Sequence, residues 1–113
     1  MADVLDQAMR AVQAYCESRV PKDLREELRI ECTRRGSSIT ILERRPPWKP
    51  DLGSQWSEIK VAQLRYEDSA GTWSVHCSDS SGRWHLFDDV RPSRTVEPLL
   101  AVVDADPTGI FWG

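Results

Sequence analysis

The chain has 113 residues, enough for one domain around one hydrophobic core. Its hydrophobic share of 40% and charged share of 29% are ordinary for a globular protein. The longest aliphatic run, residues 99–103, is far too short to span a bilayer. Asp3 and Asp6 interrupt the N-terminus where a signal peptide needs an apolar run. We therefore expect a cytoplasmic protein without a membrane partner.

The net charge of -3 is unevenly distributed. Residues 28–65 carry eight basic and four acidic side chains, whereas acidic residues dominate on both sides of this segment. The middle third is therefore the candidate surface for an anion. The alternative is that basic and acidic segments neutralise each other across a sheet. Five tryptophans make the chain tryptophan-rich, and several are expected to be half-buried with one edge available to a partner.

Three cysteines, Cys16, Cys32 and Cys77, are widely spaced and odd in number. This pattern favours reduced thiols over a disulfide framework. The sequence His76-Cys77, with His85, is the one hint of zinc. Neighbouring residues of a strand point to opposite faces, so His76 and Cys77 cannot easily ligate one ion. We expect no metal and no cofactor.

Apolar residues at spacings of three and four predict a helix over residues 3–19, with Asp3 as its N-cap and its apolar stripe on the sheet. Alternation predicts a hairpin over residues 27–45 that turns at Gly36-Ser37. A proline-rich loop over residues 45–53 follows, and long loops of this kind are often functional.

Further strands are expected at 58–67, 72–78 and 83–87, the first of them central and buried on both sides. Thr95 is expected to cap a short helix over residues 96–103, and Ile110-Phe111-Trp112 to dock as a short strand or wedge. The predicted fold is a single α+β domain over residues 1–113. An antiparallel meander of about five strands carries an N-terminal helix on one face, with a short C-terminal helix and a terminal strand.

Arginine and aromatic side chains lie close together in the sequence at several points. An arginine beside an aromatic ring can stack on nucleobases and bind phosphate or carboxylate. The commoner use is structural, in which arginines cover tryptophans at a sheet edge and pair with acids. The candidate ligand-binding residues are Arg44, Arg45, Trp48, Trp56, Arg65 and Trp84.

Pro50-Asp51 followed by Glu58-Ile59-Lys60 matches the PD…ExK pattern of many metal-dependent nucleases. In such enzymes two acids hold Mg²⁺ and a lysine activates water. Here Asp51 lies in a loop instead of on a strand, the acid spacing is short, and Glu58 with Lys60 is more simply an exposed strand face.

Several motifs together resemble the small bacterial family known as domain of unknown function 3024. They are Glu43, Arg45-Pro46, Trp48, Trp56, Arg65-Tyr66, Trp73, Arg83-Trp84-His85, Asp106, Gly109 and Phe111-Trp112-Gly113. The resemblance covers nearly the whole chain, and the closing Gly-Ile-Phe-Trp-Gly is its most specific part. It implies an independent small protein, and it supplies no reaction, cofactor or catalytic residue.

We therefore expect a non-enzymatic binding or interaction module. Its ligand would be anionic, a nucleic acid or an acidic peptide, at the basic 44–65 region. Within that region, the loop over residues 44–48 is the expected centre of the site. The alternative is a divergent PD-ExK nuclease using Asp51, Glu58 and Lys60.

Overall fold

The computed structural model describes residues 2–47 and 56–112, with the side chains of all but Ala2 and Asp3. The elements in chain order are α1 (Ala2–Arg19), the 3-10 helix η1 (Lys22–Leu24), β1 (Arg29–Arg35), β2 (Ser38–Arg45), β3 (Ser57–Glu67), β4 (Thr72–Ser78), β5 (Trp84–Leu86) and α2 (Glu97–Ala105). The strands form one antiparallel sheet in the order β1-β2-β3-β4-β5. The predicted α+β meander is confirmed.

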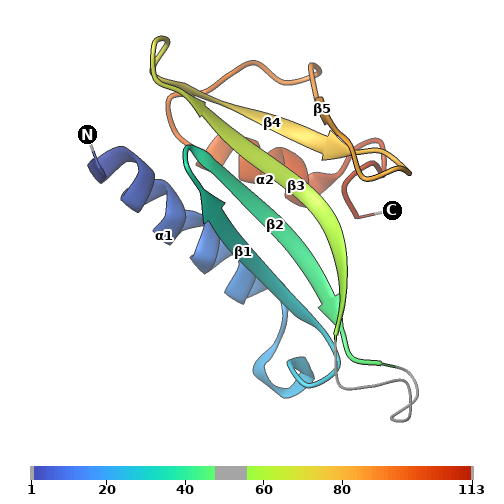
Figure 1. The fold of residues 1–113 in the computed structure, drawn as a ribbon. Coiled ribbons are helices and arrows are strands. Elements are labelled where there is room, and N and C mark those ends of the chain that lie inside the picture. Colours follow the sequence, from blue (N-terminus) through green and yellow to red (C-terminus); the bar gives the residue numbers. More distant parts are fainter. Residues whose placement is uncertain (1, 48–55, 113) are drawn as a thin grey trace.

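Both helices lie on the same side of the sheet, as Figure 1 shows. The core fills the space between these two layers. Val12 of α1 and Leu99 of α2 are completely buried there, as are Ile39 of β2 and Leu64 of β3. Trp73 of β4 is 1% exposed and packs against Tyr66, with the ring centroids 5.1 Å apart. One tryptophan therefore serves the core and is not available to a partner.

A two-residue turn joins β1 to β2 at Gly36-Ser37, as predicted. Gly36 has φ +59, a left-handed conformation that glycine adopts without a steric penalty. The turn pairs Arg35 with Ser38 and fixes the register, so Cys32 lies opposite Ile41. This register directs Ile30 and Cys32 toward the helix layer, where both pack against the core.

A β-bulge in the β2–β3 pair changes which residues of β3 face the core. Ile41 pairs with Ala62 and Leu42 with Lys60, which leaves Val61 as the extra residue. Val61 and Ala62 are consequently both buried. The expectation that β3 is buried on both sides is wrong, because the bulge, and not a second covered face, accounts for the two consecutive apolar positions. β3 is central in the sheet, as expected.

The C-terminal segment differs in detail from the prediction. α2 begins at Glu97 and its N-cap is Val96, without a side-chain cap, so Thr95 does not cap it. At the other end of the chain, α1 already includes Ala2, so Asp3 lies inside the helix and is not its N-cap. Residues 107–112 form turns, so the terminal strand is absent from the described part of the chain.

The end of the chain nevertheless docks on the core. Phe111 is 5% exposed and meets Phe87 edge-on, with centroids 5.1 Å apart. Trp112 donates its indole N–H to the carbonyl of Val103 at 2.9 Å, and the Arg19 guanidinium lies 4.2 Å from its ring centroid. Ile110, by contrast, is 44% exposed. The segment is therefore a wedge held by its two aromatic residues.

Neither α1 nor α2 combines the length and the apolar character that a membrane-crossing helix needs.

Candidate functional site

The face of the sheet opposite the helices carries no helix in the described ranges 2–47 and 56–112 (Figure 1). We call it the open face. Directly paired residues of neighbouring strands share a face, so the register of the strands assigns the members of the open face. They are Arg29, Glu31, Thr33, Arg35, Ser38, Thr40, Leu42, Arg44, Glu58, Lys60, Gln63, Arg65, Glu67, Thr72, Ser74, His76, Ser78, Trp84 and Leu86.

The open face is positively charged in a negatively charged chain. Five of its side chains are cationic and three are carboxylates, a net charge of +2, whereas the whole chain carries -3. The cations belong to β1, β2 and β3, so the positive charge lies on the half of the sheet built by the basic middle third. This segment was expected to form the anion-binding surface.

Arg44 lies between two carboxylates on this face. Its Nε is 3.4 Å from Glu31 on β1 and its Nη2 is 3.9 Å from Glu58 on β3. The Nε contact lacks hydrogen-bond geometry, and this buried nitrogen has no hydrogen-bond partner among the described residues. Since the three side chains are 30% to 52% exposed, these ion pairs are weak and leave Arg44 able to exchange partners.

Two half-buried tryptophans each lie against a cation. The Arg29 guanidinium lies 4.2 Å from the ring centroid of Trp56, the residue that precedes β3. Lys60 Nζ lies 5.6 Å from the ring centroid of Trp84 and donates to the carbonyl of Gly82 at 2.7 Å. Both distances are within the range of a cation–π contact. Each tryptophan is thereby held with one cation beside its ring.

The turn before β5 positions Trp84. The Asp79 carboxylate accepts the backbone N–H groups of Ser81 at 2.9 Å and Arg83 at 3.0 Å, and its other oxygen lies 2.5 Å from His85 Nε2. Hydrogen bonds from Ser81 and His85, with a smaller contribution from the Arg83 N–H, hold the pKa of Asp79 well below its ordinary value. The ionised carboxylate therefore fixes the backbone on both sides of the turn.

Polar side chains connect the strands in the middle of the open face. Gln63 Nε2 donates to Thr40 Oγ1 at 3.0 Å, and Arg65 Nε donates to Gln63 Oε1 at 2.6 Å. On the neighbouring strand, Ser74 Oγ and His76 Nε2 lie 3.0 Å apart. Burial, together with the nearby charge of Arg65, lowers the pKa of His76. His76 is therefore neutral at pH 7.

The structure brings some of the six predicted ligand-binding residues together and separates others. Arg44, Arg65 and Trp84 lie on the open face, and Trp56 lies against Arg29 of that face. Arg45 points to the opposite side, where its Nε donates to Glu43 Oε1 at 2.7 Å. Trp48 lies outside the described residues. So do residues 49–53, the rest of the expected proline-rich loop.

The sequence analysis did not select Arg29 as a ligand-binding residue. It considered Lys60 only as the lysine of the nuclease alternative. Both became visible only through strand register, which places Arg29 opposite Arg44 and Lys60 opposite Leu42. For Arg29 the signal available in the sequence was the Gly36-Ser37 turn, since a two-residue hairpin fixes the pairs between β1 and β2. The turn does not locate Lys60, because its pairing with Leu42 depends on the bulge between β2 and β3.

No observation favours the nuclease alternative. Glu58 and Lys60 share the open face, but Glu58 pairs with Arg44 and Lys60 bonds to a backbone carbonyl. Asp51 lies outside the described residues. Within residues 2–47 and 56–112, no group of three or more histidine, cysteine or acidic side chains has a metal-binding arrangement.

The fold and the open face together define a small α+β protein whose five-stranded sheet is covered by helices on one side and is basic on the other. The chain belongs to the family described as Domain of unknown function (DUF3024), whose model matches residues 1–113. The resemblance expected from its motifs is therefore confirmed over the whole chain. Comparisons with curated proteins and with solved structures gave no match.

Proposed function

We propose that the open face binds single-stranded nucleic acid and that the protein is a non-enzymatic binding module. The observation that carries this proposal is the pairing of two half-buried tryptophans with cations on an uncovered, net positive sheet face. Single strands are bound elsewhere by this combination, in which bases stack on aromatic rings and basic side chains follow the phosphates.

Charge supports an anionic ligand at this face. Arg65 and Lys60 are exposed, and neither forms an ion pair with a carboxylate in the described part of the chain. Arg44 is held by two half-exposed carboxylates that a phosphate can replace. The guanidinium groups supply bidentate donors for phosphate, and Lys60 supplies a point charge.

The tryptophans favour a nucleic acid over an acidic peptide. A peptide needs the cations alone, whereas exposed ring area beside the cations suits a planar base. The main counter-argument is internal compensation, because Glu31, Glu58 and Glu67 lie on the same face. A partner must therefore gain more from stacking and phosphate contacts than the protein loses from its weak surface ion pairs.

The test is a tryptophan fluorescence titration with short single-stranded RNA, single-stranded DNA and an acidic peptide, at low and at high salt. The K60Q/R65Q double variant removes two cations of the open face. The matched control, R10Q/R94Q, removes two exposed cations from α1 and from the segment before α2. Both variants change the net charge equally, so only the position of the charge differs.

We expect the control to bind as the wild type does and K60Q/R65Q to bind more weakly. The slope of log K against log salt should fall by roughly 0.7 for each lost phosphate contact. Trp84→Ala should weaken binding with little change in that slope, because stacking releases no counterions. Preference for the acidic peptide, or equal losses in the two double variants, would contradict the proposal.

A further inference from the structure

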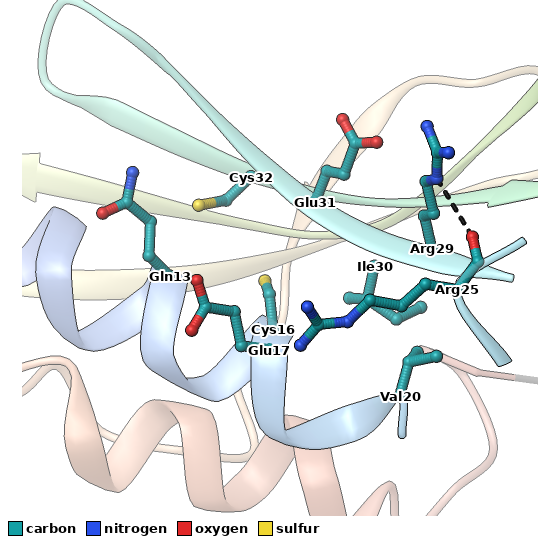
Figure 2. A pocket seen from close by; sticks show the side chains of 9 residues that line it. All are labelled: Gln13, Cys16, Glu17, Val20, Arg25, Arg29, Ile30, Glu31 and Cys32. Atoms are coloured by element: carbon teal, nitrogen blue, oxygen red, sulfur yellow. Dashed lines mark hydrogen bonds between the residues drawn. The ribbon is translucent and has the colours of Figure 1, made fainter. Parts of the chain in front are cut away.

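A pocket of about 350 Å³ lies between α1, η1 and β1, at the edge of the sheet. Figure 2 shows the side chains that line it. Among them are two thiols, Cys16 and Cys32, two guanidinium groups, Arg25 and Arg29, and two carboxylates, Glu17 and Glu31. Arg29 and Glu31 also belong to the open face, but the ligand proposed for that face requires neither thiol.

The two thiols come from different elements and meet in this pocket. Cys16 is on α1 and is 3% exposed, whereas Cys32 is on β1 and is partly exposed. Cys32 packs against the core to which Cys16 belongs. Both are free thiols. A buried thiol next to a more accessible one is the arrangement of a redox-responsive pair, with the accessible sulfur reacting first and its neighbour resolving the product.

The two thiols also differ in how readily each loses its proton. The interaction between the two thiols is the largest influence on both pKa values, because the remaining S–H stabilises the one thiolate that forms. It lowers the pKa of Cys32, and together with burial it raises that of Cys16. Glu31 opposes ionisation of either thiol. Because burial disfavours a thiolate and Cys16 is the more buried of the two, the first proton is lost from Cys32, the sulfur that solvent can reach.

A metal site explains this pocket less well. In the described part of the chain, no cluster of three or more suitable side chains can hold an ion, so the thiols would be two ligands without a third. Oxidation needs no further protein ligand. The third cysteine is separate, because Cys77 lies on β4 and its Sγ donates to the carbonyl of His85 at 3.6 Å.

We propose that Cys16 and Cys32 form a reversible redox pair that hydrogen peroxide oxidises to a disulfide joining α1 to β1. The Cys32 thiolate attacks one peroxide oxygen, the O–O bond breaks, and the departing hydroxide takes a proton to become water. The sulfenic acid on Cys32 is then attacked by the sulfur of Cys16. An S–S bond forms, the S–O bond breaks, and the second water leaves with the Cys16 proton. Two electrons pass from the thiols to the peroxide.

The reaction can be followed by mass spectrometry on the intact, folded protein treated with hydrogen peroxide. Formation of the disulfide lowers the mass by about 2 Da, the two hydrogen atoms lost, and dithiothreitol restores it. Trypsin places the three cysteines in separate peptides, residues 11–19, 30–34 and 66–83. A linked pair of peptides therefore identifies the bond without ambiguity.

Single variants separate the roles of the three cysteines. Cys77→Ser should form the same linked peptides as the wild type. Cys16→Ser should leave a sulfenic acid on Cys32 that dimedone traps, whereas Cys32→Ser should trap little on Cys16. Circular dichroism before oxidation establishes that each variant is folded.

Three results would overturn the proposal in folded protein. The first is a disulfide that includes Cys77, and the second is disulfides that form only between chains. The third is that dimedone fully traps a sulfenic acid on Cys16 in Cys32→Ser but traps none on Cys32 in Cys16→Ser. Unchanged mass in both the wild type and Cys77→Ser would overturn it equally. Oxidation of the unfolded protein in denaturant provides the comparison. We expect the Cys16–Cys32 link to dominate only when the chain is folded, because the pocket brings these two thiols together.

Discussion

The Asp106 carboxylate holds the backbone of Trp112, accepting its N–H at 2.9 Å. The other oxygen of Asp106 accepts the N–H of Phe111, also at 2.9 Å. Asp106 itself has φ 44, the left-handed conformation that ends α2, and asparagine and aspartate tolerate it better than most residues do. One residue therefore ends the helix through its backbone conformation and returns the chain end to the core through its side chain.

Replacing Asp106 should destabilise the protein through this connection. We expect Asp106→Ala to lower the free energy of unfolding by about 2–3 kcal/mol, because two hydrogen bonds to a charged group are lost and alanine tolerates a positive φ poorly. Asp106→Asn keeps one acceptor oxygen and should lose less. Urea denaturation measures both changes. An alanine variant with the wild-type midpoint would show that the carboxylate contributes nothing to stability.

The aromatic wedge at the chain end predicts unequal effects at neighbouring positions. Phe111→Ala should cost about 3–5 kcal/mol, as for other buried aromatic residues. Ile110→Ala is the matched control, because Ile110 is 44% exposed and should change the unfolding free energy by less than about 0.5 kcal/mol. A chain ending at Gly109 should lose at least as much stability as Phe111→Ala. Equal midpoints for the two alanine variants would contradict the docked wedge.

His76 predicts a pH dependence of stability. Its pKa is lower in the folded protein than its ordinary value of 6.5, so the unfolded chain binds the proton more readily. Its contribution is therefore complete above pH 6.5 and is lost as the pH falls toward the pKa of the folded state. NMR titration of the ring should give a midpoint below 6.5.

Two variants separate the origin of this effect. Arg65→Gln removes the nearby positive charge, so the pKa of His76 should rise in that variant, although burial still keeps it below its ordinary value. In His76→Gln, the free energy of unfolding should fall less than in the wild type as the pH is lowered below 7. Denaturation at several pH values measures this difference. A His76 titration midpoint above 6.5 in the wild type would refute the assignment.

Local patterns in the sequence were sufficient for the strands and their order. Strand-like runs separated by turn signals predicted strands at 58–67 and 72–78, and the structure has Ser57–Glu67 and Thr72–Ser78. Turn chemistry at Gly36-Ser37 predicted the first hairpin. These signals are local, since each depends on residues two to four positions apart.

The partners of the aromatic residues could not be predicted in the same way. Arg83 precedes Trp84 in the sequence, but the cation over the Trp84 ring is Lys60, from another strand. Similarly, the cation over Trp112 is Arg19, brought there by the docking of α1 against the chain end. Adjacent residues of a strand point to opposite faces, so sequence neighbours are the wrong place to seek such partners.

The bulge at Val61 has a consequence for changes in chain length. Because Val61 is the extra residue between two regular stretches of β3, its deletion would join Lys60 to Ala62 and leave every other side chain on its present face. Deleting Gln63 instead would turn Leu64 outward and direct Arg65 into the core. Along this central strand, position 61 is thus the place where the chain can shorten by one residue while every remaining side chain keeps its face, and the core loses only Val61.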